Sequence, residues 1–400
     1  MSLEGPESRS STPTVSRSRP MRVALDATPL LGERTGVGEF CVGALGGLSA
    51  RDDLQVSAFA VSWRRRHGIV DQLPTGVRAV RRPIPARPAL AAWRHASVPP
   101  IEWFTGEVDV VHGTNFVVPP ARRAARVVTV HDLTVVRYPQ LCDAPTLAFA
   151  RLVRRAVGEG AFVHTPSQFV AEEVIEHFGA PPERVRAVHH GIPAGAAGTG
   201  APNQTRGKAR VGGPYLLALG TIEPRKDFPR LVRAFDAIAS SHPDLRLIVV
   251  GGRGWGAEAF DEAVASSRFR ARIDATGYVD IAERESLLAG ASVFCYPSVY
   301  EGFGLPPLQA MAAGVPVVAT AVGAIPEVVG DAGVLVAAGD TAALAEAIAG
   351  VLDDARRRRQ LIEAGERRRA EFTWEATAAG LATLYADAVA DLDRSGCRTR

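Results

Sequence analysis

Residues 300–320, YEGFGLPPLQAMAAGVPVVAT, form the most informative motif of the chain. It places an acid, two glycines and two prolines directly before a run of small residues, and a β-branched segment follows. Proline is accepted in the first turn of a helix, because the N–H that it lacks would have no partner there. We therefore predict that a strand ends near Ser298, a helix begins near Leu305, and another strand covers 315–320.

The loop before this helix has the features of an anion site. Unpaired amides at a helix N-terminus favour negative charge, and glycine lets the backbone approach a ligand closely. We expect these amides to hold a diphosphate, and they belong to Gly302, Phe303, Gly304 and Leu305. Glu301 would repel a phosphate, so we expect it to accept hydrogen bonds from neutral hydroxyls. Gln309 falls in the first turns of the helix, on the side that faces the loop.

A second motif, LGTIEPRKDFPRL at 219–231, supplies positive charge. It predicts a strand that ends at Gly220 and a helix that begins near Asp227, whose carboxylate would cap it. Arg225 and Lys226 stand just before this cap. Two cations beside a helix N-terminus are suited to clamp a diphosphate.

Strands alternate with helical patterns through both halves of the chain, which predicts parallel, doubly wound α/β sheets. Residues 192–213 are Gly-, Ala- and polar-rich without periodicity, so they suggest a linker. We expect a disordered tail at 1–20, an N-terminal Rossmann-like domain at 21–192, a linker at 193–213 and a second such domain at 214–373. Ligands of such folds bind at the carboxyl ends of the strands, here in a cleft between the domains.

The strand positions expected in the first half are 22–27, 56–61, 76–81, 108–113, 126–132, 161–167 and 184–191, with helices at 144–157 and 168–178. Those expected in the second half are 215–220, 245–252, 272–279, 292–298 and 315–320, with three closing helices near 341–353, 355–370 and 374–393.

Two motifs of the first half are expected to face the cleft. GERTGVGEF at 32–40 follows the first strand and brings Gly36 and Gly38 into a loop that leads to a helix. VTVHDLT at 128–134 places His131 at a strand end, where it could contact a sugar or a phosphate.

Composition limits the other possibilities. The net charge is only +3, which does not suggest a nucleic-acid partner, but residues 51–100 hold nine Arg against three Asp. Within this segment, residues 64–94 form a basic region, which favours an anionic acceptor or a peripheral membrane contact. The four cysteines are scattered and no apolar run is long enough to span a membrane, so we expect a cytoplasmic protein, or one at the inner face of the membrane.

The motifs GTIEPRKDFPRLVRAF and PSVYEGFGLPPLQAMAAGVPVVAT resemble the donor-binding motifs of retaining GT-B glycosyltransferases, specifically family 4, and the motif order matches over residues 21–393. The resemblance implies that Glu301 contacts the donor sugar and that Arg225 and Lys226 stabilise the leaving phosphates. It implies that the Gly36–Gly38 loop closes over the substrates and that His131 faces the reacting sugar. It further implies that the turn with Tyr278 and Val279 holds the base through its backbone, and that the helix at 374–393 returns to the N-terminal acceptor domain.

Two positions depart from the family pattern. The second acid of its motif is Gln309 here, which keeps the length and a carbonyl acceptor but weakens the expected contact to the ribose hydroxyls. Thr221 stands where many relatives carry a further Arg, so the phosphate clamp would rest mainly on Arg225 and Lys226.

The resemblance thus implies an enzyme that transfers a sugar, with retention of configuration, from a nucleotide sugar to a glycan, lipid-linked or small-molecule acceptor. We favour GDP-mannose as donor, with a UDP-sugar as the alternative, and we expect neither a cofactor nor a metal site. Two alternatives stay open at this point: a catalytically weak sugar-nucleotide-binding protein, and a GT-B-fold sugar-nucleotide epimerase.

Overall fold

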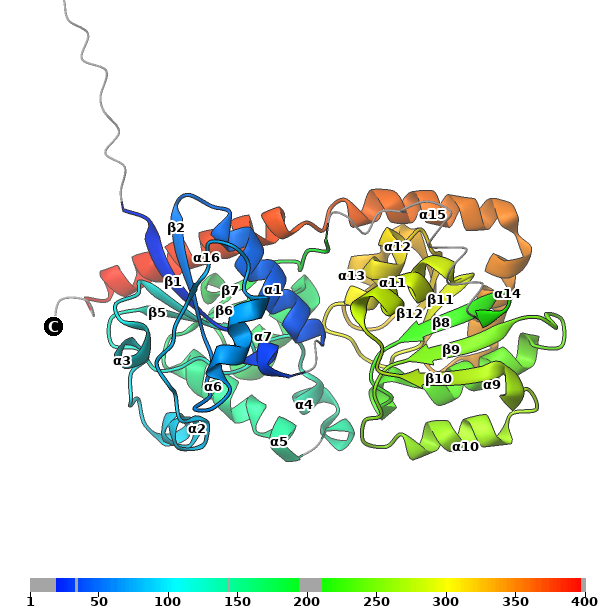
Figure 1. The fold of residues 1–400 in the computed structure, drawn as a ribbon, viewed down its shortest axis with the longest axis horizontal. Helices are drawn as coiled ribbons and strands as arrows, with labels where there is room; N and C mark the ends of the chain where they lie inside the picture. The colour runs from blue at the N-terminus through cyan, green and yellow to red at the C-terminus, as the bar shows by residue number, and fades with distance from the viewer. Residues whose placement is uncertain (1–18, 33–34, 143, 194–210, 397–400) are drawn as a thin grey trace, which may run out of the picture.

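The protein folds into two α/β domains that lie side by side (Figure 1). The computed structural model describes residues 19–32, 35–142, 144–193 and 211–396. Most of the expected tail at 1–20 and of the expected linker at 193–213 therefore lies outside the described residues.

The N-terminal domain is built on a seven-stranded parallel sheet in the order β3-β2-β1-β4-β5-β6-β7. Its strands are β1 Met21–Asp26, β2 Leu54–Phe59, β3 Arg78–Ala79, β4 Val110–Gly113, β5 Ala125–Thr129, β6 Phe162–Thr165 and β7 Val185–Ala187. Its helices are α1 Gly36–Ser49, α2 Ala86–His95, α3 Glu102–Thr105, α4 Thr134–Arg137, α5 Ala144–Leu147, α6 Phe149–Gly158 and α7 Gln168–Phe178. β4 and β6 are buried at every position, because helices cover both faces of a doubly wound sheet.

The C-terminal domain repeats this plan with a six-stranded parallel sheet in the order β10-β9-β8-β11-β12-β13. Its strands are β8 Tyr215–Leu219, β9 Arg246–Val250, β10 Ile273–Gly277, β11 Val293–Tyr296, β12 Val317–Thr320 and β13 Gly333–Val336. Its helices are α9 Phe228–Ile238, α10 Glu258–Ser266, α11 Ile281–Gly290, α12 Leu305–Ala312, α13 Ile325–Val329, α14 Thr341–Asp353 and α15 Ala355–Arg369. The doubly wound α/β architecture predicted from the sequence is confirmed.

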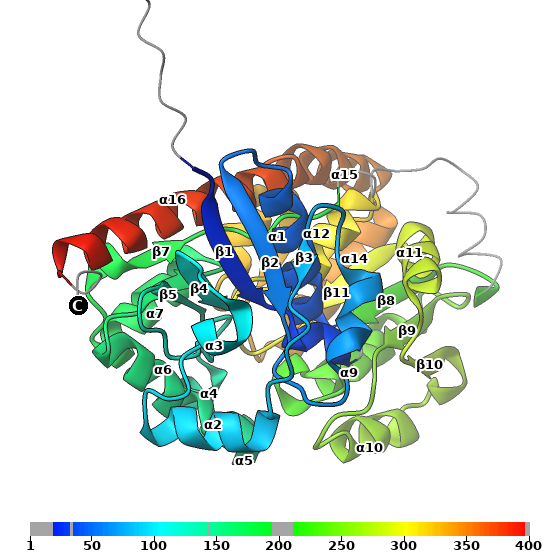
Figure 2. The same ribbon diagram turned by 60° about the vertical axis from the view of Figure 1, so that its left-hand side comes forward.

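The last helix, α16 Trp374–Arg394, leaves the C-terminal domain and packs on the N-terminal one (Figures 1 and 2). Leu381 and Tyr385 are buried in the same apolar cluster as Val23 and Leu25 of β1. A Cβ atom at Gly43 of α1 would lie 2.0 Å from the Trp374 ring, so the glycine allows α1 and α16 to approach closely.

One expectation about the elements was wrong, and two elements were missed. The single helix expected at 144–157 is two segments, α5 and α6, which meet at Ala148. α2 and β13 were not predicted. β13 has only four residues, and all of them are half-buried. It therefore shows neither the alternating burial nor the full burial by which strands are recognised.

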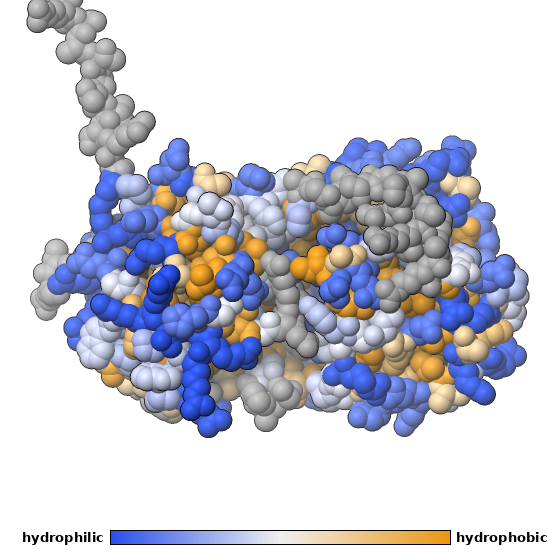
Figure 3. Space-filling model, viewed as in Figure 1, coloured by the Kyte–Doolittle hydropathy of each residue, from blue (hydrophilic) through white to orange (hydrophobic). Residues whose placement is uncertain are grey.

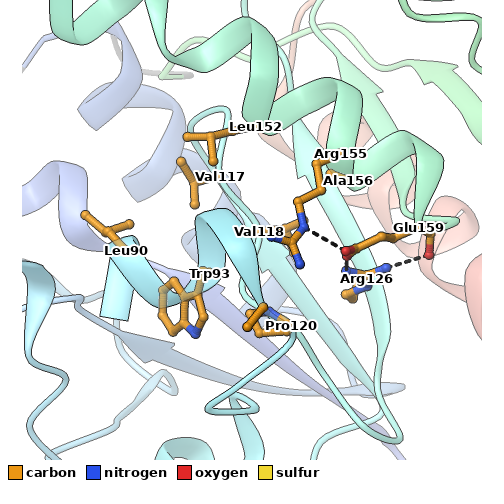
Figure 4. Close-up of a pocket in the computed structure, with 11 residues that line it drawn as sticks. Leu90, Trp93, Val117, Val118, Pro120, Arg126, Leu152, Arg155, Ala156 and Glu159 are labelled. Atoms are coloured by element: carbon orange, nitrogen blue, oxygen red, sulfur yellow. Dashed lines mark hydrogen bonds and ion pairs between the residues drawn. The ribbon is translucent and has the colours of Figure 1, made fainter. Parts of the chain in front are cut away.

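A small hollow lies within the N-terminal domain, between α2 and α6 (Figure 4). Its volume is about 20 Å³, enough for a water molecule but not for a sugar. Its lining combines Trp93 and Leu152 with the ion pairs of Glu159 to Arg126 and Arg155. In the described part of the chain, none of the helices has the length and hydropathy of a membrane span.

Candidate active site

A cleft of about 500 Å³ lies between the two domains, at the carboxyl ends of both sheets. This volume is typical of sites for small organic ligands. The N-terminal domain contributes the start of α1 and the loop after β5, and the C-terminal domain contributes the loops after β8, β9, β10 and β11. The predicted site residues that line it are Gly36, His131, Arg225, Lys226, Tyr278, Val279, Glu301, Gly302, Phe303, Gly304, Leu305 and Gln309.

The floor of the cleft holds one carboxylate between two cations. Lys226 Nζ donates to Glu301 Oε1 at 2.6 Å, and Arg225 donates to Oε2 at 2.8 Å. Lys226 also donates to the Tyr296 hydroxyl at 2.8 Å, and Arg225 to Glu223 at 2.8 Å. Arg225 and Lys226 come from the short turn after β8, and Glu301 from the loop after β11, a neighbouring strand in the sheet.

Charge pairing decides the ionisation of Glu301, which is 6% exposed. Burial alone would raise its pKa, but the charges of Arg225 and Lys226 and the hydrogen bond from Lys226 outweigh burial and lower the pKa to about 2. The carboxylate is therefore ionised at neutral pH. We expected its oxygens to be available to neutral hydroxyls, whereas in this structure each of them accepts from a cation.

The loop before α12 presents free amides to the cleft. Among the described residues, no hydrogen bond accounts for the amides of residues 302–305. Gly304 adopts φ +114°, which favours glycine, and a Cβ atom at Gly302 would lie 1.9 Å from the carbonyl oxygen of His131. Ser167 donates to the Gly302 carbonyl at 2.7 Å, so the N-terminal domain holds this loop in place. The loop can therefore receive an anion without first breaking a bond.

His131 has a defined tautomer. Its Nε2 lies 2.8 Å from the Thr114 carbonyl, which can only accept, so Nε2 carries the proton. Burial lowers the pKa of His131 below its ordinary value despite this bond. The neutral ring therefore keeps Nδ1 as an acceptor.

Two details of the predicted motifs were wrong. Asp227 does not cap α9 through its side chain; it adopts a left-handed conformation with φ 46°, and its carboxylate accepts instead from Arg230 at 2.5 Å. Gly38 does not lie in a loop, because α1 already begins at Gly36, and Gly38 is buried within the first turn away from the cleft lining.

Several cleft residues were missed. Glu223 lies in the quoted EPRKD segment and Asp132 follows His131, so sequence proximity could have indicated both. Glu39 of α1 and Arg284 of α11 pair across the cleft at 3.2 Å. No local pattern links residues so far apart in the chain.

Hydrogen bonds also join the domains beside the cleft, in a region that we call the seam. The Tyr300 hydroxyl accepts from the amide of Leu133 at 2.8 Å. Glu327 of α13 accepts from the amides of Gln168 and Phe169, at 2.8 and 3.1 Å. A carboxylate of one domain thus caps α7 of the other, where the helix dipole favours negative charge.

Comparison with known proteins shows the family of this chain. The family described as Glycosyltransferase Family 4 matches residues 35–195, and that described as Glycosyl transferases group 1 matches residues 213–354. O-antigen chain mannosyltransferase B of Escherichia coli is 32% identical over 273 residues, which are 66% of this chain and 71% of that protein. D-inositol 3-phosphate glycosyltransferase of Acidothermus cellulolyticus is 30% identical over 316 residues, 72% of this chain and 66% of that protein.

Solved structures show the same fold at low identity. Anabaena HepE in complex with UDP and glucose has a TM-score of 0.72 at 19% identity, covering 92% of this chain and 99% of that one. Sucrose-phosphate synthase of Thermosynechococcus elongatus has a TM-score of 0.71 at 22% identity, covering 93% and 100%. WaaG, a glycosyltransferase of lipopolysaccharide biosynthesis, has a TM-score of 0.68 at 18% identity, covering 88% and 95%. This chain belongs to the GT-B glycosyltransferases, in the group 1 and family 4 lineage.

Proposed function

We propose that this glycosyltransferase moves a mannosyl group from GDP-mannose to a hydroxyl of a glycan, lipid-linked or small-molecule acceptor, with retention of anomeric configuration. The observation that carries the proposal is the Arg225–Glu301–Lys226 arrangement beside the free amides of residues 302–305. Cations and amides aimed at one place are suited to a diphosphate leaving group, and the adjacent carboxylate to a sugar hydroxyl.

The reaction would proceed on one face of the sugar. The bond between the anomeric carbon and the diphosphate oxygen breaks, the acceptor oxygen bonds to that carbon, and the acceptor proton passes to the departing phosphate. Negative charge grows on the diphosphate as the bond breaks. We assign the stabilisation of this charge to Arg225, Lys226 and the loop amides, a kind of preorganisation that lowers a barrier.

The choice of mannose and guanine rests on similarity. The E. coli relative is named as a mannosyltransferase. The EPRKD and EGFGLPPL segments of this chain resemble those of family members that use GDP-mannose. The HepE structure contains UDP and glucose, so UDP-sugars are the alternative to test.

A thermal-shift panel of sugar nucleotides, followed by product analysis, tests this function. We expect GDP-mannose and GDP to raise Tm, and GDP-mannose with an acceptor to give a mannosylated product of unchanged anomeric configuration. A shift by UDP-glucose alone would reassign the donor. Conversion of the nucleotide sugar into an epimer without acceptor would refute glycosyl transfer, and binding without turnover would leave a binding protein.

The basic region 64–94 supports a peripheral membrane contact as part of the same proposal. Trp63, just before Arg64, and Trp103 are each 58% exposed. Arg82 donates to the Trp103 carbonyl at 2.7 Å, and Arg122 stacks over its ring. Figure 3 shows strongly hydrophilic groups beside hydrophobic ones on this domain. Aromatic rings among cations suit an anionic lipid surface. We expect sedimentation with phosphatidylglycerol vesicles and not with phosphatidylcholine vesicles; equal behaviour would refute the contact.

A further inference from the structure

His190 lines the cleft and has a ring nitrogen without a hydrogen-bond partner among the described residues. It is 4% exposed and lines the cleft together with His131. Its Nε2 is buried and has no hydrogen-bond partner among the described residues. Burial lowers the pKa of His190 well below its ordinary value, so the ring is neutral and offers one donor and one acceptor. A buried polar group without a hydrogen-bond partner costs free energy. A residue with such a group in the lining of a cleft is therefore a candidate for contact with a ligand.

Packing holds the plane of the His190 ring. It stacks on Phe40 with ring centroids 4.3 Å apart and interplanar angle 23°, and Phe303 lies 5.0 Å away on another side. The backbone is held on both sides: Thr377 donates to the carbonyl of His189 at 2.8 Å, and Ile192 donates to a carbonyl of the segment before α16 at 3.1 Å. The ring is therefore fixed in position.

The buried histidines behind it are fully satisfied. His164 Nε2 lies 3.0 Å from the Val188 carbonyl and must donate to it, so His164 Nδ1 accepts from Thr129 at 2.9 Å. The Thr129 oxygen then accepts from His112 Nε2 at 2.7 Å, which leaves His112 Nδ1 to accept from Tyr385 at 2.7 Å. These bonds define which nitrogen donates and which accepts in His112 and in His164. His190 has no such bonds, although it is equally buried.

We propose that His190 hydrogen-bonds a hydroxyl of the transferred sugar. The inference rests on the proposed function and names a further substrate-contacting residue within it. A neutral imidazole matches a neutral hydroxyl, which can accept and donate at once. The diphosphate has its own site at residues 302–305, and Phe303 of that loop contacts the His190 ring. The sugar, bonded directly to the diphosphate, is the part of the donor that would reach the side of the cleft lined by Phe303, His131 and His190. His131 lies 5.5 Å from His190, ring to ring.

The test compares binding of GDP-mannose with binding of GDP, which lacks the sugar. In His190→Phe the ring still stacks on Phe40 but has no nitrogen. We expect its affinity for GDP-mannose to fall about tenfold, as for the loss of one hydrogen bond of ~1.4 kcal/mol. Its affinity for GDP should stay within about twofold of the wild type. Its Tm without ligand should be unchanged or higher, because a buried unpaired group is gone. His190→Gln, which keeps a donor and an acceptor, should recover most of the GDP-mannose affinity.

His177→Phe is the matched control. His177 Nε2 is also buried without a hydrogen-bond partner among the described residues, but it lies in the last turn of α7 and not in the cleft lining. We expect it to leave both affinities unchanged.

Unchanged GDP-mannose binding in His190→Phe would overturn the inference, as would equal losses for GDP-mannose and GDP or an effect confined to the acceptor KM. If His190→Phe does not fold, weak binding of GDP-mannose by a folded His190→Gln variant would overturn it too. If the wild type binds UDP-glucose instead, the same comparison is made with UDP-glucose and UDP. A wild type that binds neither donor would refute the proposed function itself.

Discussion

Lys226 Nζ lies 2.6 Å from Glu301 Oε1, and this contact joins the two motifs from which the site was predicted. The pair is buried, and Arg225 completes it from the other carboxylate oxygen. An incoming diphosphate therefore meets two cations that already share a carboxylate. In the proposed function Glu301 would compete with the phosphates for these cations, in addition to any role toward the sugar.

Glu301→Gln should separate these two roles. We expect turnover to fall more than tenfold, that is by more than ~1.4 kcal/mol, because the sugar loses its carboxylate. GDP binding should hold or become tighter, because Arg225 and Lys226 are released for the phosphates. Steady-state rates and calorimetric GDP binding check both expectations. Glutamine is a better variant than alanine, because truncation at Glu301 would leave the buried Lys226 without its carboxylate partner.

Turnover above a tenth of the wild-type rate in Glu301→Gln would deny Glu301 a central role. Much weaker GDP binding would show that the carboxylate orients the cations more than it competes with the phosphates.

Lys226→Ala and Arg225→Ala should each reduce turnover more than GDP affinity. The charge that they stabilise grows as the sugar leaves, so the transition state loses more than the bound donor does. Their Tm should also fall, since each change breaks a buried pair, which typically costs about 3–5 kcal/mol. The check is a comparison of kcat with GDP Kd in variants that circular dichroism shows to be folded. Equal losses would mean that the pair only binds.

Activity should survive EDTA. In the proposed reaction Arg225, Lys226 and the loop amides would meet the phosphate charge. Within the described ranges the His, Cys, Asp and Glu side chains form no group of three that could hold a metal ion. Initial rates before and after chelation test this. Complete loss, reversed by magnesium or manganese, would contradict the metal-free mechanism.

Gln309→Glu should be tolerated. Gln309 lines the cleft from the second turn of α12, and a carboxylate of the same length can accept from both ribose hydroxyls. The opposing effect is one more negative charge near the diphosphate, eased by the nearby helix N-terminus. We expect donor KM to fall slightly, by at most ~1 kcal/mol of binding, with little change in kcat. Gln309→Leu, without an acceptor, should raise KM. Tenfold weaker donor binding by Gln309→Glu would show that the amide itself is required.

Asp26→Asn should stabilise the protein in a pH-dependent way. Burial raises the pKa of Asp26 to about 6, although Thr28 donates to its carboxylate through both its amide and its hydroxyl. A raised carboxyl pKa means that stability present below about pH 4 is lost as the pH rises through 6. Asparagine stays neutral, so the variant should gain up to about 3 kcal/mol at pH 8 and almost nothing at pH 4.

Thermal unfolding of both proteins at pH 8 and pH 4 measures this difference. Asp53→Asn is the control of opposite sign, because the pKa of Asp53 is lowered through its bond with Arg51 and its removal should lower Tm at pH 8. A gain for Asp26→Asn that does not depend on pH would contradict the role of Asp26 ionisation.

Local patterns predicted the regular elements well. α7 begins after Ser167, whose hydroxyl caps it, and ends before Gly179 in the left-handed conformation, so both ends follow from residue type. The amides of the loop at 302–305 could be foreseen for the same reason, since glycine and proline fix their place before α12. Asp227 was different: it lies before a helix, as a cap should, but Arg230 takes its carboxylate.

Tertiary packing decided the rest. The sequence placed Glu301, Arg225 and Lys226 in one cleft, but not in contact, because their pairing depends on the spacing of β8 and β11. The unused edge of His190 could not be foreseen either. The three buried histidines, His112, His164 and His190, look alike in the chain, and only their neighbours show which one lacks a partner.

The seam has a mechanical consequence for donor entry. The seam joins the domains on one side of the cleft through Tyr300 with Leu133, Glu327 with α7, and the close approach of Gly302 to His131. α1 and α11 are joined instead by the half-buried ion pair of Glu39 and Arg284. The two domains are therefore held together along the seam. A rotation of the domains that admits the donor would break the Glu39–Arg284 ion pair and keep the contacts of the seam. The loop at 302–305 would then stay against the N-terminal domain while the opposite edges of the cleft move apart.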